Sequence, residues 1–330
     1  MNSGNNSDFK WGILGTGGIA RAFANDLAHL PDHSVSAVGS RTIAAATSFA
    51  ANYPGAIGYG SYEELVASDV DAIYVATPHT FHAEHSLLAL SAGKPVLCEK
   101  PFTINAEQAR TVVDLARAKN LPLLEAIWTR FLPHIHQMQQ IIASGALGEI
   151  LTVSADHGQY LPREKHPRLW EPELGGGALL DLGIYSITLA HLVLGAPAKI
   201  TSDVTKTSEG VDLQTSMLFH YPNGAQAILT CTMANRTSIT ATVAGNKARL
   251  ELDASFYAPT SMRLITREGE VTEYPKTYVG HGLREEAVEF ARMVRTGEIE
   301  SPLMPHSRTV EIMEIMDSVR REHGVIYPGE

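Results

Sequence analysis

A glycine-rich stretch near the N-terminus has the residue types that a dinucleotide requires. Its members are, in order, Gly15, Thr16, Gly17, Gly18, Ile19 and Ala20. The stretch fits the pattern G-x-G-x-x-(G/A), follows an apolar run and opens an amphipathic segment. In this pattern the first glycine permits a tight turn, the second lets the backbone approach a pyrophosphate, and the helix amides then face the phosphates. We therefore expect a dinucleotide site here, against the alternative of a purely structural turn.

The end of the second expected strand bears on which dinucleotide is bound. An NAD-selective site usually places Asp or Glu there to accept hydrogen bonds from the ribose hydroxyls. The chain has no acidic residue between Asp32 and Glu63, and Ser40 and Arg41 stand at this point instead. A hydroxyl and a guanidinium suit the additional phosphate of NADP. We expect NADP to be preferred, with NAD possible; in the alternative, Arg41 is only a solvated residue at the start of a helix.

Two further groups of residues have types suited to proton and charge chemistry. Lys100, in the motif Cys98-Glu99-Lys100-Pro101, follows an apolar run that we read as a strand. It should therefore lie at a carboxyl end, where ligands bind in parallel sheets. Asp181 and Tyr185 follow three consecutive glycines and, on a helix, share one face. In the alternative, Lys100 is a surface lysine and Tyr185 an ordinary aromatic residue of a helix.

The elements that must position these residues fall into two patterns. Short apolar runs alternate with helical patterns from Phe9 to about Ile127, which is typical of βαβ units and a parallel sheet. After Trp128 the chain reads as helices and alternating β-branched runs, with a hairpin signal at Asn223-Gly224. We expect an α/β protein in which residues 1–127 form a Rossmann domain with a doubly wound sheet. Residues 128–330 should form an α+β substrate-binding and dimerisation domain with a large, mostly antiparallel sheet, whose last helix can pack back on the first domain.

Composition and charge exclude several classes of protein. The 330 residues are 44% hydrophobic and 19% charged, which excludes disordered, collagen-like and disulfide-stapled chains. The net charge is −10 with no basic cluster, so we expect no nucleic-acid partner. Cys98 and Cys231 lie in apolar runs and read as buried reduced thiols. With a polar N-terminus that is unlike a secretory signal and no run of about 18 apolar residues, we expect a cytoplasmic protein without a membrane partner.

Four motifs together indicate a family. They are the glycine loop, the segment Ala76-Thr77-Pro78-His79-Thr80-Phe81-His82, the motif Glu99-Lys100-Pro101, and the triglycine stretch with Asp181. In this order, and over nearly the whole chain, they resemble the family of glucose-fructose oxidoreductase, inositol dehydrogenase and MocA proteins. The resemblance implies that Thr77, Pro78 and His79 border the cofactor, together with Glu99 and Lys100. His82 either joins them or is a capping or packing residue.

One position departs from the usual pattern of that family. The family places His four residues after the helical Asp, and this chain has Tyr185 there. With the segment Glu125-Ala126-Ile127-Trp128-Thr129-Arg130-Phe131, the tyrosine resembles the dimeric dihydrodiol dehydrogenase branch. That likeness implies NADP-dependent oxidation of trans-dihydrodiols of arenes or of aldopyranoses such as xylose. It puts an inositol-type substrate in doubt.

The chemistry of alcohol oxidation then suggests roles for the catalytic candidates. A base must take the hydroxyl proton while hydride leaves the same carbon for the nicotinamide. Tyrosine is a poor base near its ordinary pKa of about 10, and an adjacent ammonium would favour the phenolate. Lys100 is expected to supply that charge, and Tyr185 to act as the base. Asp181 would orient Lys100 or a sugar hydroxyl; its own charge disfavours the phenolate, so it is not assigned as the sole base.

Weaker signals concern the substrate and metals. Aromatic faces and guanidinium groups suit polyols, so a sugar-binding cleft could be lined by Trp128, Arg130, His157, Tyr160 and Trp170. Each of these could equally be ordinary interdomain packing. The 14 histidines include His82/His85 and His134/His136, but no Cys or carboxylate set completes a tetrahedral site. We expect no metal.

Several functions compete with the leading one. Within catalysis the alternatives are a keto-sugar reductase, an inositol-type polyol dehydrogenase, or a hydrolase or epimerase with tightly held NAD. A catalytically silent cofactor-binding regulator is the alternative from another class, because a fold does not dictate function. Lys100 together with Asp181 argues against it, since a silent protein would be free to lose them. The antiparallel sheet needs a cover on its second face, so we expect a homodimer or a dimer-based tetramer.

Overall fold

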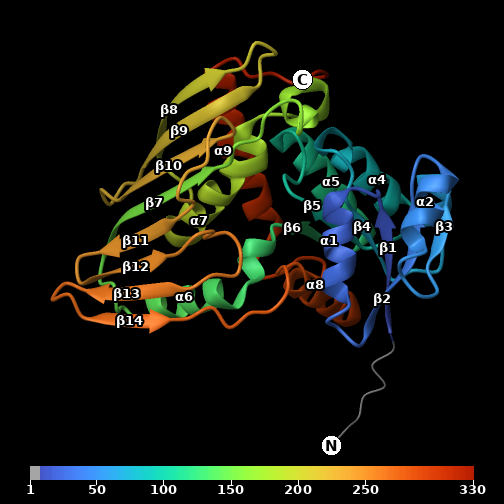
Figure 1. Ribbon diagram of the computed structural model, residues 1–330, viewed down its shortest axis with the longest axis horizontal. Helices are drawn as coiled ribbons and strands as arrows, with labels where there is room; N and C mark the ends of the chain where they lie inside the picture. The colour runs from blue at the N-terminus through green and yellow to red at the C-terminus, as the bar shows by residue number, and fades with distance from the viewer. Residues whose placement is uncertain (1–7) are drawn as a thin grey trace, which may run out of the picture. The chain divides into compact units, whose positions relative to one another are not determined.

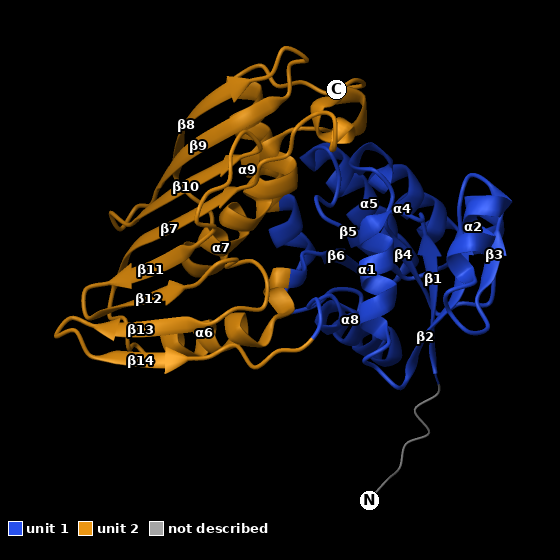
Figure 2. Cartoon of the chain, in the orientation of Figure 1, with its two compact units in different colours: residues 1–128, 280–310 blue, residues 129–279, 311–330 orange. Residues whose placement is uncertain are grey.

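The computed structural model describes residues 8–330, which divide into two units (Figure 2). Unit 1 comprises residues 1–128 and 280–310, and unit 2 comprises residues 129–279 and 311–330. The first division lies one residue from the expected domain boundary. Residues 280–310, expected in the second domain from sequence, belong to unit 1, and the final helix runs into unit 2.

Unit 1 contains a six-stranded, entirely parallel sheet (Figure 1). The strands are β1 (Phe9–Leu14), β2 (His33–Gly39), β3 (Ile57–Tyr59), β4 (Ala72–Val75), β5 (Val96–Glu99) and β6 (Leu123–Ala126). Their order is β3-β2-β1-β4-β5-β6. This is the doubly wound strand order of dinucleotide-binding domains. The sheet is extended in one direction from β1 to β3 and in the other from β4 to β6, and such sheets bind ligands at the switch point between β1 and β4. The expected fold class is confirmed for this half of the chain.

The helices of unit 1 connect these strands, except for the last helix, which comes much later in the chain. They are α1 (Gly18–Leu27), α2 (Ile43–Ala50), α3 (Tyr62–Val66), the short η1 (His79–Phe81), α4 (His82–Ser91), α5 (Ala106–Lys119) and α8 (Arg284–Thr296). Asp26 at the end of α1 explains why α8 belongs here, because its carboxylate accepts the backbone N–H groups of His281, Gly282 and Arg284 at 2.9–3.0 Å. Phe290 of α8 also packs on Trp11 of β1. These hydrogen bonds and this ring contact therefore explain why residues 280–310 belong to unit 1.

Unit 2 contains an eight-stranded sheet. Its strands are β7 (Ile150–Gly158), β8 (Lys199–Lys206), β9 (Asp212–His220), β10 (Gln226–Thr232), β11 (Ala241–Gly245), β12 (Ala248–Leu252), β13 (Met262–Thr266) and β14 (Val271–Tyr274). The order is β14-β13-β12-β11-β7-β10-β9-β8, antiparallel throughout except for the pair β7–β10. Gly224, with φ +85°, turns the expected hairpin between β9 and β10. The expected mostly antiparallel sheet is confirmed.

The helices of unit 2 pack beside this sheet. They are α6 (Pro133–Ala143), η3 (Pro167–Trp170), η4 (Pro172–Leu174), η5 (Leu179–Gly183) and α7 (Ile184–Leu194), while η2 (Trp128–Phe131) and α9 (His306–Glu322) cross the division between the units. The stretch Pro172–Leu194 is long and apolar enough to span a membrane by composition, but 83% of its most apolar window is buried in the fold. Contacts with β7 and β10 make it a core element of unit 2.

Candidate functional site

The glycine loop of unit 1 has the geometry that its sequence predicts. Gly15 has φ +112°, and its N–H donates to the carbonyl of Gly39 at 3.0 Å. A Cβ at this position would lie 2.7 Å from the carbonyl oxygen of Ala76, just beyond β4. Only glycine tolerates both the positive φ and this approach. The loop therefore brings the ends of β1 and β4 together at the point where the sheet reverses its order.

The start of α1 is open to an anion. Gly17 and Gly18 are exposed, and a Cβ added to either would meet nothing within 4 Å. No side chain caps the helix, and its first turn carries no acidic residue. Uncapped amides at a helix N-terminus attract phosphate through their N–H groups and the helix dipole. The residues present fit the pyrophosphate of a dinucleotide.

Ser40 and Arg41 follow β2 directly. Ser40 is buried and its N–H donates to the carbonyl of Tyr59 at 3.2 Å, whereas Arg41 is exposed. The capping of α2 is performed by Thr42, whose hydroxyl accepts the N–H of Ala45 at 3.3 Å. Within residues 8–330 the Arg41 guanidinium makes no hydrogen bond or ion pair. Arg41 is thus not needed for the helix start and is available for a ligand.

The backbone around Lys100 is held by buried carboxylates. The Glu99 carboxylate accepts a hydrogen bond from the hydroxyl of Tyr74 on the neighbouring strand β4, and it also accepts the N–H of Lys100 at 3.1 Å. Glu125 on β6 accepts the N–H of Phe102 at 3.2 Å. Glu99 and Glu125 are both 3% exposed, while the Lys100 side chain is partly exposed. Two buried carboxylates therefore fix the loop and leave the lysine at its surface.

His82 connects the loops that follow β4 and β5. Its Nδ1 lies 2.8 Å from the carbonyl oxygen of Pro101, and its Nε2 lies 2.8 Å from that of Thr77. The ring is fully buried. Burial lowers the pKa of His82 to about 4, although the two carbonyl contacts act in the opposite direction. A neutral imidazole has one N–H, so His82 donates to one of these two carbonyl groups and contacts the other, and it lies between the Thr77-Pro78 and Lys100-Pro101 segments.

Unit 1 also contains a buried carboxyl group without a hydrogen-bond partner among residues 8–330. Glu286 on α8 is fully buried, and neither of its oxygens has a hydrogen-bond partner in the described chain. Burial raises its pKa well above the usual range, and the negative charges of Glu99, Asp26 and Glu125 raise it further. This shift favours the protonated form of Glu286, since burial and neighbouring carboxylates both disfavour the charged form.

In unit 2 the turn that carries Asp181 differs from a regular helix. Residues 179–183 form a π-helical turn that continues into α7, so Asp181 and Tyr185 do not lie on one regular α-helix. Asp212 of β9 accepts the N–H of Leu179 at 2.7 Å and the hydroxyl of Thr215 at 3.0 Å. Gly177, with φ +112°, has no room for a Cβ because the Asp212 carboxylate occupies that space. Such π turns are frequent at functional sites, and this one sets the direction of Asp181.

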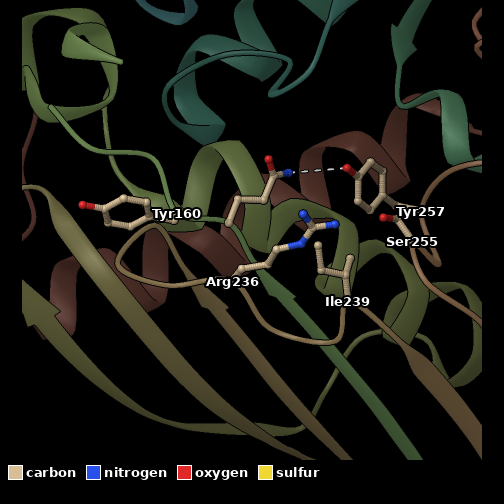
Figure 3. Close-up of a pocket in the computed structure, with 6 residues that line it drawn as sticks. Tyr160, Arg236, Ile239, Ser255 and Tyr257 are labelled. Atoms are coloured by element: carbon tan, nitrogen blue, oxygen red, sulfur yellow. Dashed lines mark hydrogen bonds between the residues drawn. The ribbon is translucent and has the colours of Figure 1, made fainter. Parts of the chain in front are cut away.

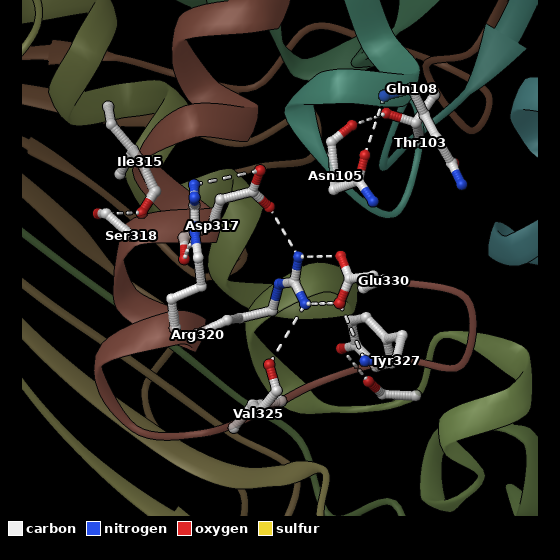
Figure 4. Close-up of polar contacts among 12 residues, drawn as sticks. Thr103, Asn105, Gln108, Ile315, Asp317, Ser318, Arg320, Val325, Tyr327 and Glu330 are labelled. Atoms are coloured by element: carbon white, nitrogen blue, oxygen red, sulfur yellow. Dashed lines mark hydrogen bonds and ion pairs between the residues drawn. The ribbon is translucent and has the colours of Figure 1, made fainter.

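The C-terminal tail supports the same turn (Figure 4). The hydroxyl of Tyr327 donates to the carbonyl of Gly176 at 2.6 Å. Arg320 of α9 holds the tail by bonds to Glu330 at 2.9 Å and to Asp317 at 2.7 Å, and its guanidinium lies over the Tyr327 ring. Because Arg320 is 2% exposed, these bonds are shielded from water. The last residues of the chain therefore fix the glycines before Asp181.

Three aromatic rings gather beside the π turn. Tyr257 stacks on His157 with ring centroids 4.3 Å apart and lies 4.6 Å from the Tyr185 ring. His157 is 1% exposed, and its Nδ1 lies 3.1 Å from the carbonyl oxygen of Leu182. Since a carbonyl only accepts, Nδ1 donates and the other nitrogen is free to accept the Gln159 amide at 3.0 Å. Burial raises the pKa of Tyr257. His157 links β7 to the Asp181 turn and presents Tyr257 next to Tyr185.

Asp181 has a partner that the sequence did not suggest. The guanidinium of Arg168 lies 3.1 Å from its carboxylate, and the arginine side chain is 45% exposed while that of Asp181 is 13% exposed. Arg168 stands two residues before Trp170 with no motif around it, so no pattern in the sequence marks it. The Arg168 guanidinium therefore donates to the Asp181 carboxylate at a partly exposed position.

A pocket of about 310 Å³ opens beside these rings (Figure 3). It is lined by Gln159, Tyr160, Arg236, Ile239, Ser255 and Tyr257. Of these, only Tyr160 was a candidate from sequence. The other five come from the end of β7 and two loops far apart in the chain, and only the fold brings them together.

The remaining substrate candidates lie in different places. Trp128 belongs to unit 1, where its ring lies 5.1 Å from that of His281. Arg130 is buried in unit 2, and Trp170 donates its indole N–H to the carbonyl of Leu161 at 3.0 Å. Tyr160 is 67% exposed. Of the five predicted residues, His157 packs beside Tyr185 and Tyr160 lines the pocket; a substrate role for the set stays a prediction. Among residues 8–330, no group of three or more metal-ligating side chains gathers.

Comparison with known proteins decides the family. Residues 9–126 match the oxidoreductase family with an NAD-binding Rossmann fold, and residues 135–251 match the GFO/IDH/MocA C-terminal domain. The chain belongs to the GFO/IDH/MocA oxidoreductase family. This confirms the resemblance inferred from the four motifs. The chain is an oxidoreductase, and unit 1 contains its NAD-binding Rossmann fold.

Similar proteins cover nearly the whole chain. D-xylose 1-dehydrogenase (NADP(+)) of Hypocrea jecorina is 36% identical over 99% of this chain and 95% of its own. Human trans-1,2-dihydrobenzene-1,2-diol dehydrogenase is 36% identical over 97% of this chain and 98% of its own. A 3-ketoreductase from Actinomadura kijaniata, solved with NADP and TDP-benzene, has 28% identity and a TM-score of 0.85 over 96% of this chain and 98% of its own.

Proposed function

We propose that this protein is an NADP-dependent oxidoreductase that transfers hydride between the cofactor and a hydroxyl group of a sugar or a trans-dihydrodiol. The observation that carries the proposal is the pairing of an open α1 N-terminus with an unpaired Arg41 at the end of β2. The xylose and dihydrodiol dehydrogenases, similar over almost all of the chain, support the substrate class and the cofactor.

Residues of unit 1 would hold the cofactor and one charge. The loop Gly15–Ala20 would bind the pyrophosphate, and Ser40 with Arg41 the ribose phosphate of NADP. Thr77, Pro78 and His79 would border the nicotinamide end, with His82 and Glu99 as buried supports. When bound, the nicotinamide supplies the hydride acceptor or donor. Lys100 would place its ammonium on the reacting oxygen and stabilise the negative charge that develops there.

Residues of unit 2 would handle the proton and the substrate. Tyr185 would accept the hydroxyl proton at its phenol oxygen during oxidation and return it during reduction. Asp181, paired with Arg168, would accept a hydrogen bond from Lys100 or from a substrate hydroxyl. Variants of the Actinomadura ketoreductase with a lysine replaced by alanine and a tyrosine replaced by phenylalanine have been solved, which supports attention to these two residue types.

A screen of NADP reduction over aldoses, polyols and arene dihydrodiols tests the proposal directly. We expect turnover with at least one aldose or trans-dihydrodiol and tighter binding of NADP than of NAD. Arg41→Ala should weaken NADP binding by about tenfold, which is the loss of one charge-assisted contact, and leave NAD binding unchanged. Absence of NADP-linked turnover with all three classes, or tighter NAD binding by the unaltered protein, would refute it.

A keto-sugar reductase is the second candidate. It is favoured by the likeness to the Actinomadura 3-ketoreductase over both chains. The same residues serve either direction, because the base that takes a proton in oxidation donates it in reduction. NADPH oxidation with a set of keto sugars, compared with NADP reduction by the parent alcohols, separates the two. A silent regulator would bind NADP and show neither reaction.

We further propose a cytoplasmic homodimer or dimer-based tetramer that assembles through the sheet of unit 2. Along β10 the side chains alternate: Ala227 and Leu229 are buried, whereas Gln226 and Ile228 are exposed, Ile228 by 50%. An outward-facing apolar residue such as Ile228 gains from a second sheet placed on it. The two buried free cysteines suit a reducing compartment. Light scattering at micromolar concentration should give twice the monomer mass or more; a monomer would refute the assembly.

A further inference from the structure

The pocket beside Tyr257 contains an arginine that makes no hydrogen bond or ion pair within residues 8–330. Arg236 lines it from the loop between β10 and β11, and its guanidinium extends toward the side where Tyr257 lies (Figure 3). The side chain is exposed and makes no hydrogen bond or ion pair with another described residue. In a chain of net charge −10, most surface arginines find a carboxylate, as Arg168, Arg249 and Arg263 do in this unit.

The other lining groups match the charge of Arg236. Ser255 and Tyr257 contribute hydroxyls, the amide nitrogen of Gln159 bonds to His157 and to the Tyr257 hydroxyl, and none of the six lining residues is acidic. Sites for neutral sugars need acceptors for the hydroxyl protons, a role that carboxylates fill well. A pocket with one guanidinium and several donors instead matches an oxyanion, to which planar guanidinium groups bind in a bidentate manner.

The loop that carries Arg236 is fixed in place. The Asp156 carboxylate of β7 accepts the N–H groups of Ile239 at 2.8 Å and Thr240 at 3.1 Å. Thr237 is tied to Gly158 by two bonds, one to its hydroxyl at 2.8 Å and one from its N–H at 3.1 Å. Ile239 has φ +56°, which is strained for a β-branched residue. Strain held by surrounding bonds is typical of binding sites that are organised before the ligand arrives.

The pocket also adjoins the proposed base. Tyr257 forms one wall, and the same ring lies 4.6 Å from that of Tyr185. A substrate whose reacting carbon lies at Tyr185 would therefore direct a remote substituent past Tyr257 toward Arg236. The volume of about 310 Å³ is at the lower end for ligand pockets and suits one substituted sugar ring.

We propose that this pocket binds an oxyanion on the substrate, so that the preferred substrate is an acidic sugar, carrying a carboxylate or phosphate remote from the reacting carbon. The proposal rests on the proposed function, since it names the substrate class of the same site. Arg236 pairs with the anion, and the Ser255 hydroxyl donates to one of its remaining oxygens. Tyr257 packs against the sugar ring.

Steady-state kinetics with matched substrates test it. D-glucose, D-glucuronate and D-glucose 6-phosphate differ only at the group remote from C1, and we expect kcat/KM to be about tenfold or more higher for an acidic member than for glucose. Arg236→Gln should abolish this preference mainly through KM and leave the glucose reaction within about twofold, and Arg236→Lys should restore part of it. Which acid is favoured distinguishes a carboxylate from a phosphate. The matched control is Arg267→Gln, an exposed arginine of unit 2 outside the pocket, which should retain the preference.

Equal kcat/KM for the three sugars, or an equal loss for all of them in Arg236→Gln, overturns the proposal. If none of the sugars turns over, the proposed function is refuted. The anion site is then tested separately by calorimetric titration. We then expect D-glucuronate or inorganic phosphate to bind the unaltered protein and the Arg267→Gln variant but not Arg236→Gln. Absence of binding to the unaltered protein, or equal binding to Arg236→Gln, overturns the anion site.

Discussion

The loop around Lys100 in unit 1 and the aromatic cluster around Tyr185 in unit 2 are held in place by different means. Backbone groups of the Lys100 loop bond to enclosed side chains: the Lys100 N–H to Glu99, the Phe102 N–H to Glu125 and the Pro101 carbonyl to His82. The cluster in unit 2 depends on side chains that face one another, with rings 4.3 and 4.6 Å apart. A hydrogen bond to a backbone group remains when the side chain of that residue is substituted. A contact between two side chains is altered when either of them is substituted.

This difference explains how one fold can keep a cofactor and vary a substrate. In unit 1 the shape of the site follows from Gly15 and the backbone, so it tolerates little change. In unit 2, Tyr257 and Arg236 contribute through their side chains on connecting segments, where substitution alters recognition without disturbing the sheet. Experiments that perturb each region in turn should therefore give different kinetic signatures.

Lys100→Met should have the largest effect. The change keeps the length and apolar stem of the side chain but removes the charge proposed to stabilise the reacting oxygen. We expect kcat to fall by about a thousandfold or more with NADP affinity nearly unchanged, because the charge acts in the transition state more than in the ground state. Stopped assays of turnover with fluorescence titration of NADPH measure both. A parallel loss of NADP binding would assign Lys100 to the cofactor instead.

Tyr185→Phe comes next. It removes only the phenol oxygen, so the ring contact with Tyr257 remains while the proposed base is lost. We expect turnover to fall by about a hundredfold or more, and the rise of the rate toward alkaline pH to disappear. Tyr257→Phe is the matched control, and it should keep that pH profile. Normal turnover and an unaltered profile in Tyr185→Phe would leave this residue as a wall of the pocket.

His82→Asn should have a moderate effect through positioning. The shorter amide cannot reach both the Pro101 and Thr77 carbonyls, so the Lys100 loop loses a connection to the loop after β4. We expect kcat to fall about tenfold with a smaller change in substrate KM, since small displacements of a catalytic group are costly. His82→Gln, with a longer amide, should recover part of the rate.

The control for His82 is another enclosed histidine of unit 1. The Nε2 of His306 lies 2.9 Å from the carbonyl oxygen of Leu123, away from the Lys100 loop. His306→Asn should lower the thermal midpoint to a similar extent as His82→Asn and leave kcat unchanged. If both variants lose stability alike and neither loses turnover, His82 is a packing residue only.

Asp212 should produce the smallest effect, visible as pH dependence of stability. Burial raises the pKa of Asp212 from its ordinary value of 3.8 to about 7. The hydrogen bonds from the Leu179 N–H and the Thr215 hydroxyl lower the pKa, but burial outweighs them. Between these values the folded chain holds a proton that the unfolded chain has released, so this group stabilises the fold at low pH and the contribution declines as pH rises toward 7. Urea unfolding at pH 5, 6, 7 and 8 should show this decline in the unaltered protein and a flatter profile in Asp212→Asn.

An exposed carboxylate on a neighbouring strand provides the comparison for that profile. Asp203 lies on β8 and is solvent-exposed, so Asp203→Asn should retain the decline of the unaltered protein. Parallel profiles for Asp212→Asn and the unaltered protein would mean that Asp212 stays ionised in the folded state. In that case its bonds to Leu179 and Thr215 outweigh its burial.

The local sequence pattern predicted most helices and strands. It failed for very short elements and for a turn whose contacts are distant in sequence. The bounds of helix α5 follow from local residue types, because Asn105 caps it and Asn120 ends it in a left-handed conformation. The short strand β3 and helix α3 were not expected, since three and five residues are too few to show a period. The π turn at residues 179–183 was read as ordinary helix, because its cause is a bond from Leu179 to Asp212, 33 residues away.

The sequence by itself determined the features that depend on neighbours along the chain. The glycine loop, the alternation of strands and helices, and the placement of Lys100 after a strand all follow from local residue order, which fixes backbone conformation over a few residues. The tertiary structure alone decided which distant side chains meet. Arg168 pairs with Asp181, Tyr257 stacks on His157, and residues 280–310 join unit 1 through Asp26. Such contacts arise from burial and bonding between segments that only the folded sheet brings within reach.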